Sequence, residues 1–245
     1  TASTNPLFNG NTVCGSQSND GQLPATDAFY PTGQTSFTWS SGTSHAAPAV
    51  AGIASLYYYW LENTYHLSEP SPAMMKAYLI AHTLYLTGAG ANDTLPGNGQ
   101  GYGLPDMSLG LDDTPRVLLD QRVLFGESGE QWTQEVQVAD PTKPVRIVMA
   151  YTDAPGAVGS SPQVNDLNLR IDTATASYVG NHFQLQWSMP DGLPDSKNNY
   201  EAIFLRPGEA AALNLTVTAF NIAGDGVPNN EDETDQDFAL ICYNC

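Results

Sequence analysis

Basic side chains are scarce in this sequence. Lysine and arginine together number 8, against 26 aspartates and glutamates, and the formal net charge is −18. Nucleic acids and anionic membranes are bound through basic patches, so neither is an expected partner. The acidic balance is typical of secreted proteins and of proteins that hold hard cations with carboxylates, although solvated acidic loops account for most of the charge.

Long apolar runs are missing as well. The 245 residues contain no run of about 18 apolar residues, which excludes a membrane-spanning helix. The opening TASTNPLFNG has neither a basic start nor an apolar middle, so we do not expect a signal peptide there, and a mature or truncated chain would look the same. The chain is long enough for one large domain or two modest ones.

Cysteine occurs only three times, at Cys14, Cys242 and Cys245. The last two form C-Y-N-C, which lacks the second pair or the histidines of a zinc site and does not open a helix as a redox dithiol would. We therefore predict a small disulfide loop between Cys242 and Cys245. Cys14 is then left over, either as a free thiol or with a partner elsewhere.

The spacing of apolar residues in the sequence changes near residue 112. Before it, two helical patterns cover about residues 44–62 and 71–86. The glycines of residues 97–111 do not form the G-x-G-x-x-G fingerprint of a dinucleotide site. After Pro115, apolar residues alternate in RVLLDQRVLF, WTQEVQV, VRIVMAYT, DLNLRID, YEAIFL, ALNLTVTAFN and DFALICY. This alternation predicts an antiparallel β-sandwich or jelly roll over residues 115–245, joined by a linker at residues 111–116.

One serine stands where the first helical pattern begins. Small apolar residues cover most of the pattern after Ser44, which favours a helix in the protein interior, and Pro48 fits its first turn. A serine there is often only an N-cap. The alternative is a nucleophile, because the N–H groups at a helix start stabilise the oxyanion that forms when a hydroxyl attacks a carbonyl.

The segment GTSHAAPAVAG, residues 42–52, resembles the serine motif of the subtilisin-like serine proteases, or subtilases. The matching positions are Gly42, Thr43, Ser44, Ala46, Pro48, Ala51 and Gly52. SPAMMKAYLIAHT looks like the helix that follows in this family, and GYGLPDM looks like the loop that closes its catalytic domain. The resemblance implies that residues 1–112 are the C-terminal part of a parallel-sheet α/β domain. It also implies that Ser44 is the acyl-forming nucleophile of an extracellular endopeptidase acting on protein or peptide substrates.

The sequence departs from this family in its remaining catalytic residues. The family's Asp and His motifs, and its oxyanion-binding Asn, have no match among the residues before Ser44. His45 follows Ser44 directly, so its side chain points elsewhere on a helix. The other histidines, His66, His82 and His182, are not expected to act as the base. We expect an upstream part of the catalytic domain to supply Asp, His and Asn, and the isolated chain to be inactive.

Residues 115–245 resemble the jelly-roll domain that follows the catalytic unit in proprotein convertases. The similar segments are YTDAPGAVGSSPQVNDLNLRI, YVGNHF, NNYEAIFL and LTVTAFNIAGDG. Domains of this group often bind calcium, and two oxygen-rich loops here suit a hard cation. The candidate ligands are Asp153, Asn165, Asp166, Asp195, Asn199 and Glu201. The alternative is that these residues cap turns, as Asp and Asn often do.

Two further features bear on function. The acidic run DGVPNNEDETDQD, residues 225–237, lacks the spacing of an EF-hand and is expected to be a solvated hairpin tip. Trp187, Tyr178 and Phe183 could line a sugar site, but they fit a core equally well. A non-catalytic calcium-dependent binding module, or a carbohydrate-binding β-sandwich, is therefore the alternative to the peptidase.

Overall fold

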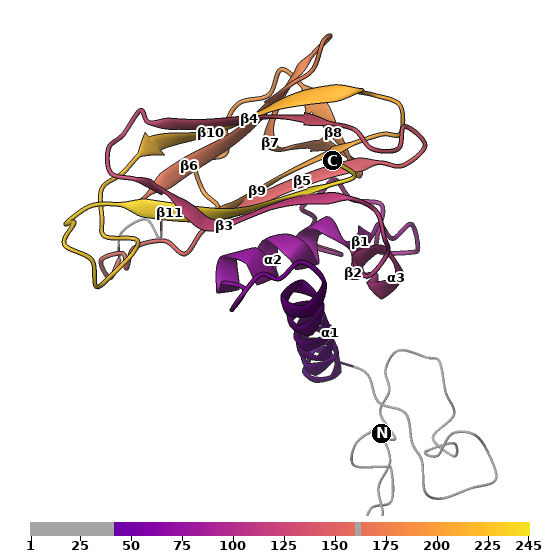
Figure 1. Cartoon of the computed structure of the whole chain (residues 1–245). Helices are drawn as coiled ribbons and strands as arrows, with labels where there is room; N and C mark the ends of the chain where they lie inside the picture. The colour runs from indigo at the N-terminus through magenta and orange to yellow at the C-terminus, as the bar shows by residue number, and fades with distance from the viewer. Residues whose placement is uncertain (1–41, 160–162) are drawn as a thin grey trace, which may run out of the picture. The chain divides into compact units, whose positions relative to one another are not determined.

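The structure is a computed structural model that describes residues 42–159 and 163–245 (Figure 1). The chain divides into two compact units, Thr1–Gly52 and Ile53–Cys245. The domain boundary expected at residues 111–116 stays a prediction. Cys14 lies outside the described residues.

Helices and one small sheet make up the first part of the described chain. Helix α1 spans Thr43–Thr64, α2 spans Pro72–Ala81 and α3 spans Met107–Gly110, while strands β1 (Thr83–Leu84) and β2 (Leu104–Pro105) pair antiparallel. The hydroxyl of Ser71 caps α2 by accepting from the Met74 N–H at 2.9 Å. The helix predicted to reach residue 86 ends earlier, because residues 83–84 leave it to pair with β2.

Nine antiparallel strands form a two-layer β-sandwich, as the alternation predicted. One sheet has the order β4-β10-β6-β7-β8 and the other β3-β11-β5-β9. Their bounds are β3 Arg116–Phe125, β4 Gln131–Gln137, β5 Val145–Ala150, β6 Asp166–Asp172, β7 Ser177–Gln184, β8 Trp187–Pro190, β9 Tyr200–Leu205, β10 Ala212–Asn221 and β11 Gln236–Tyr243. Between residues 42 and 245, apart from 160–162, no parallel sheet is seen. The expected α/β parallel-sheet remnant is therefore not part of the described fold.

Two apolar cores lie on either side of the four-stranded sheet. The first fills the space between the two sheets and includes Ile147, Leu169 and Leu240, all about fully buried. The second lies between the four-stranded sheet and the helices, where Tyr57 and Tyr78 have no exposed surface. Every residue of β5 is buried, including Arg146, because both faces of the strand are covered. In the part of the chain that is described, no helix is long and apolar enough to cross a bilayer.

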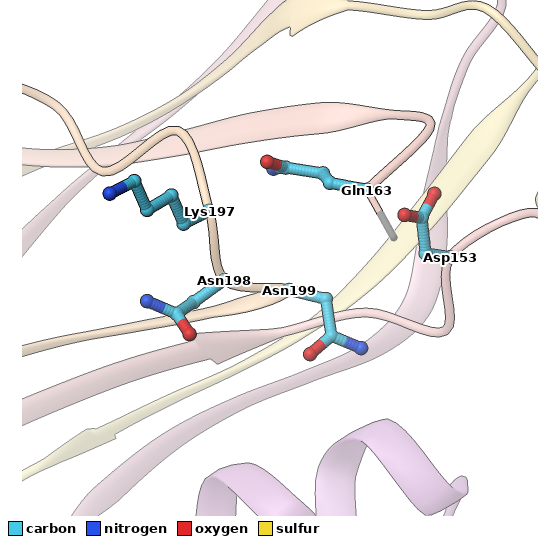
Figure 2. Close-up of a pocket in the computed structure, with 5 residues that line it drawn as sticks. All are labelled: Asp153, Gln163, Lys197, Asn198 and Asn199. Atoms are coloured by element: carbon cyan, nitrogen blue, oxygen red, sulfur yellow. The ribbon is translucent and has the colours of Figure 1, made fainter. Parts of the chain in front are cut away.

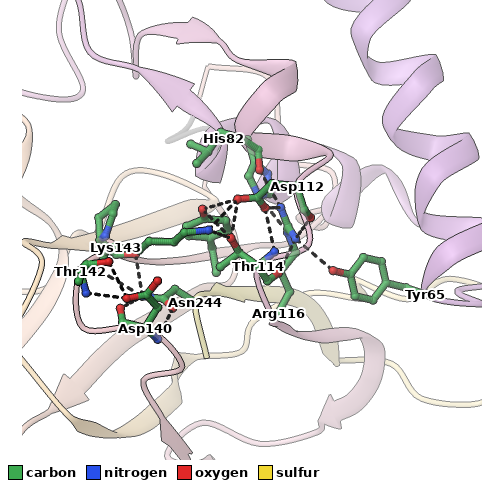
Figure 3. Close-up of polar contacts among 12 residues, drawn as sticks. Tyr65, His82, Asp112, Thr114, Arg116, Asp140, Thr142, Lys143 and Asn244 are labelled. Atoms are coloured by element: carbon green, nitrogen blue, oxygen red, sulfur yellow. Dashed lines mark hydrogen bonds and ion pairs between the residues drawn. The ribbon is translucent and has the colours of Figure 1, made fainter.

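A largely buried polar cluster joins Tyr65, His82 and Asp112 to the first strand of the sandwich (Figure 3). The guanidinium of Arg116, at the start of β3, donates to the Nε2 of His82 at 3.2 Å and to the carboxylate of Asp112 at 2.7 Å. It also donates to the hydroxyl of Tyr65 at 3.1 Å. Burial and, after it, the charge of Arg116 lower the pKa of His82 to about 3, so this imidazole is neutral at neutral pH.

The last residues of the chain lie beside the same cluster. Cys242 and Cys245 form a disulfide with a Cα–Cα distance of 5.7 Å, as predicted. Between them, the hydroxyl of Tyr243 donates to Asp112 at 3.0 Å. The side chain of Asn244 accepts from the Asp140 N–H and donates to its carbonyl. The short disulfide loop thus fastens the chain end to two other segments.

Candidate functional site

The first candidate site is the start of helix α1. Gly42 has a φ of 144°, which a residue with a side chain rarely adopts, and its carbonyl accepts from the N–H groups of His45 and Ala46 at 3.0 and 3.2 Å. The helix therefore begins at Thr43 and Ser44 is its second residue. The side chain of Ser44 is exposed. N–H groups in a first helical turn have no intrahelical partner and favour negative charge beside them.

The solvent exposure of the apolar residues of α1 changes along the helix. The small side chains from Ala46 to Ala49 are exposed, whereas Tyr57 and Leu61, further on, are fully buried. An entirely interior helix was expected, and the described residues bury only its second half. This first half is an exposed apolar surface of the kind that another layer covers in folded proteins.

The four histidines differ in what their rings contact. The ring of His82 is fully buried, with Nδ1 beside the Tyr78 carbonyl at 2.8 Å and Nε2 accepting from Arg116. The Nδ1 of His182 lies 3.1 Å from the Met189 carbonyl. His45 adjoins Ser44 on the helix, and His66 is an exposed residue with a φ of 53°. The rings of His82 and His182 are therefore engaged in contacts within the fold.

The second candidate site lies in the loops at one end of the sandwich, where two predicted ligands have structural partners. The carboxylate of Asp153 accepts from the N–H groups of Val164 and Asn165, both at 2.8 Å. The amide of Asn165 is fully buried; its oxygen accepts from the N–H groups of Ala223 and Gly224. Its nitrogen donates to the carbonyls of residues 224 and 235 and to the side chain of residue 236. The side chain of Asn165 therefore joins these loops through its hydrogen bonds.

A polar pocket of about 230 Å³ opens beside these loops (Figure 2). Its lining residues are Asp153, Gln163, Lys197, Asn198 and Asn199. A third predicted ligand, Asn199, has both ends of its amide engaged. Its nitrogen donates to the Tyr151 carbonyl, and its oxygen accepts from the Lys76 ammonium, each at 2.9 Å.

Of the remaining predicted ligands, Asp166 and Glu201 keep the features of a cation site. Both carboxylate oxygens of Asp195 instead accept hydrogen bonds, from the Lys197 N–H and from the side-chain amides of residues 181 and 198. Glu201 has no exposed surface and Asp166 is 8% exposed. The Oε2 of Glu201 accepts from the Leu169 N–H at 2.7 Å. Among the described residues, however, its Oε1 and the Oδ1 of Asp166 are buried without a hydrogen-bond partner. A buried carboxylate oxygen left in this state is unfavourable unless a proton or a cation satisfies it.

Asn168 has the same property and was missed from the sequence. Its Oδ1 is also buried without a partner in the described structure. Asp166 and Asn168 are two residues apart on β6, so their side chains leave the same face of the strand. The signal in the sequence is the alternation in NDLNL, in which oxygen-bearing side chains take every second position.

These carboxylates influence one another. Burial raises the pKa of Glu201 well above its usual value, and the charges of Asp195 and Asp166 raise it further. The pKa of Asp166 is raised by burial and then by Asp195 and Asp153. A raised pKa favours the neutral, protonated form of these carboxyls, and a divalent cation bound beside them would favour the charged form instead.

The ligand atoms available at this site limit which cations it could bind. Over residues 42–159 and 163–245, no three His, Cys, Asp or Glu side chains form a metal-binding group by themselves. A cation held here needs amide or backbone oxygens beside the carboxylates. Calcium accepts such mixed oxygen ligands, whereas zinc prefers nitrogen and sulfur.

The aromatic side chains considered for a sugar site are largely internal. Tyr178 is 4% exposed and Phe183 8% exposed, and Trp187 is partly buried against the second core. They leave no stacked aromatic platform of their own for a sugar ring.

Comparisons with known proteins give little beyond the architecture. No protein-family model and no curated protein matches the chain. Among solved structures, it is similar to the P-domain of Penaeus vannamei nodavirus at 10% identity, over 54% of this chain and 96% of that one, with a TM-score of 0.22. A likeness this distant carries no functional argument.

Proposed function

We propose that this chain belongs to a subtilisin-like serine endopeptidase in which Ser44 is the nucleophile. The observation that carries the proposal is the position of Ser44, exposed in the first turn of α1 directly after the turn at Gly42. The motif resemblance of residues 42–52 supports it. In this proposal, residues 1–112 are the C-terminal part of a catalytic domain, and the β-sandwich supports that domain.

The chemistry follows from the helix start. The hydroxyl of Ser44 attacks the scissile carbonyl while a histidine takes its proton, and the Ser44 N–H donates to the oxyanion that forms. His82 and His182 are held by structural contacts, so a partner segment supplies the base, its aspartate and the second oxyanion donor. Extracellular proteins and peptides are the proposed substrates.

Peptide hydrolysis by a longer polypeptide tests this proposal. The polypeptide carries this chain together with the segment that supplies Asp, His and Asn. We expect hydrolysis that Ser44→Ala abolishes, and stoichiometric inhibition by a fluorophosphonate. Hydrolysis that persists at full rate in the Ser44→Ala variant would reject the proposal.

A specific observation favours a second role, which is structural calcium binding at the end of the sandwich. The unpartnered buried oxygens of Asp166, Asn168 and Glu201 support it, with Asp195 adjoining them. A bound calcium ion would neutralise these facing carboxylates. If Ser44 has no catalytic role, the same site makes the chain a calcium-dependent binding module.

Calorimetric titration with Ca²⁺ tests this second role. We expect one binding event. Glu201→Gln should weaken it at least tenfold, because a neutral amide replaces one of the carboxylates that calcium prefers as ligands. The matched control is Asp172→Asn, at the end of β6, since Asp172 pairs with Arg170 at 2.7 Å on the surface. Equal weakening by both substitutions, or no binding, would reject the site.

A further inference from the structure

The tripeptide Asn-X-Thr, in which X is not proline, occurs twice in the sequence, as NLT at residues 214–216 and as NDT at residues 92–94. This tripeptide, called a sequon, is the acceptor for N-linked glycans in chains that pass through a secretory pathway. The disulfide between Cys242 and Cys245 is a bond that forms and persists in oxidising compartments outside the cytosol. The two sequons are therefore candidate modification sites.

The sequon at residues 214–216 lies on β10, which pairs with β4 on one side and with β6 on the other. Leu215 is fully buried in the core between the two sheets. Because side chains alternate along a strand, Asn214 and Thr216 lie together on the opposite, outer face of the five-stranded sheet. Asn214 is exposed and Thr216 is partly exposed. The core that α2 covers lies on the other side of the sandwich, against the four-stranded sheet.

The surroundings of Asn214 leave room for a large substituent. Its direct neighbours across the sheet are Glu135 of β4, which is exposed, and Asp172 of β6, which is partly exposed. Within residues 42–159 and 163–245, the side chains of Asn214 and Thr216 form no hydrogen bond. A sugar bonded to the Nδ2 of Asn214 would therefore break no existing contact.

The sequon at residues 92–94 is used by the fold itself. The Nδ2 of Asn92 donates to the Thr87 carbonyl at 2.8 Å, and its backbone has a φ of 67°. The hydroxyl of Thr94 accepts from the Leu185 N–H at 3.3 Å. A sugar on Asn92 would change a nitrogen that already holds its loop, whereas the nitrogen of Asn214 is free to carry one. The structure therefore favours Asn214 of the two.

We propose that Asn214 carries an N-linked glycan when the chain is secreted, and that this glycan covers the outer face of the five-stranded sheet. In the transfer, the Nδ2 of Asn214 forms a bond to C1 of the first sugar of a polyprenyl-pyrophosphate oligosaccharide. The bond from that C1 to the pyrophosphate oxygen breaks, the lipid pyrophosphate leaves, and an Nδ2 proton passes to a base of the transferase. The inference goes beyond the proposed peptidase and shares with it only the extracellular location.

Peptide mapping by mass spectrometry tests the proposal on the full chain secreted from a eukaryotic cell. We expect a glycan on Asn214 that a peptide-N-glycosidase removes, converting this residue to aspartate. Thr216→Val should abolish the glycan, because the sequon loses its hydroxyl while the strand keeps a β-branched side chain. The matched control, Thr216→Ser, keeps the hydroxyl and should keep the glycan. Asn221, exposed at the end of the same strand but outside a sequon, should stay unmodified.

An unmodified Asn214 in the secreted chain, or a glycan on Asn92 alone, would overturn the proposal. So would equal glycosylation of the original chain and the Thr216→Val variant. If Thr216→Val is not secreted, Asn214→Gln removes the acceptor itself, and the same loss of the glycan is expected. Urea unfolding then compares the glycosylated chain with the chain trimmed to its first sugar. We expect the same midpoint for both, and a lower midpoint with the intact glycan would contradict an open outer face.

Discussion

Two serines stand at the starts of two helices, and their surroundings differ. Ser71 precedes α2, is 6% exposed, and has its hydroxyl bonded to the Met74 N–H and the Asp120 carboxylate. Ser44 lies inside the first turn of α1 with an exposed side chain. Both helices are rich in small apolar residues; those of α2 are largely buried, whereas those in the first half of α1 are exposed. Ser71 is a structural cap, while Ser44 is the residue that we propose as a nucleophile.

The difference between these serines also bears on folding. The apolar residues of α2 face the second core, which this chain builds itself from β5, β9 and β11. The small apolar residues at the start of α1 are exposed instead. Helix formation is local, whereas burial depends on what is packed against the helix.

Exchanging each serine for alanine gives the largest expected contrast. In the longer polypeptide, Ser44→Ala should reduce peptide hydrolysis by at least about a thousandfold, with almost no change in the free energy of unfolding. Ser71→Ala should lower the free energy of unfolding by about 1–2 kcal/mol through loss of the cap, and leave hydrolysis near its original rate. Hydrolysis assays and urea unfolding measure the two effects. The opposite assignment of effects would break the comparison.

Acid titration tests the polar cluster around Arg116, which includes the buried ring of His82. His82 has an ordinary pKa of 6.5 when unfolded and about 3 when folded, so the unfolded state binds the proton first. Stability is therefore lost as pH falls below 6.5, by about 3 kcal/mol between pH 6.5 and pH 4. Replacing this histidine by glutamine, His82→Gln, should remove that part of the pH dependence, as urea unfolding at several pH values would reveal. An unchanged dependence would contradict the buried neutral imidazole.

A single methyl group should disturb the proposed cation site. A Cβ added at Gly180 would lie 2.1 Å from the Oε2 of Glu201, so Gly180→Ala should displace this carboxylate and weaken calcium binding. Overpacking of this kind costs about 1–3 kcal/mol of stability. The control is Gly126→Ala, where nothing lies within 4 Å of the added carbon. Calorimetry and thermal unfolding of both variants make the comparison, and equal effects would contradict the crowded position of Glu201.

The smallest expected effect distinguishes the two faces of α1. The hydroxyl of Tyr57 donates to the Asp106 carbonyl at 2.9 Å and the residue is fully buried, whereas Tyr59 is 66% exposed. Tyr57→Phe should therefore cost about 1 kcal/mol of unfolding free energy, and Tyr59→Phe almost none. Urea unfolding monitored by circular dichroism measures both. A larger loss for Tyr59→Phe would mean that the exposed face of the helix is covered in solution.

Local patterns predicted much of the fold. Alternation of apolar and polar residues identified the strands of the sandwich, because one side of each strand faces the core. The same alternation constrains the register in which neighbouring strands pair. The C-Y-N-C spacing identified the disulfide. The end of α2 could not be read, because pairing of Thr83 and Leu84 with β2 is a long-range event that overrides helical spacing.

The candidate sites were predicted less completely. Helical spacing and the serine motif placed Ser44 near a helix start, since both are local. The cation ligands depend on which side chains the loops use for their own hydrogen bonds, and composition does not reveal this. Asn165 and Asn199 bear the right oxygens, yet the fold uses both for structural contacts. Asn168 gains its unpartnered oxygen only from the burial of β6.

The most direct test of the account is a mass-spectrometric map of fluorophosphonate adducts on the chain alone and on the longer polypeptide. The account predicts an adduct on Ser44 only when a general base is supplied by the added segment, and none on Ser71 in either sample. Strong labelling of Ser44 in the isolated chain, or an adduct on another serine of the longer polypeptide, would contradict it.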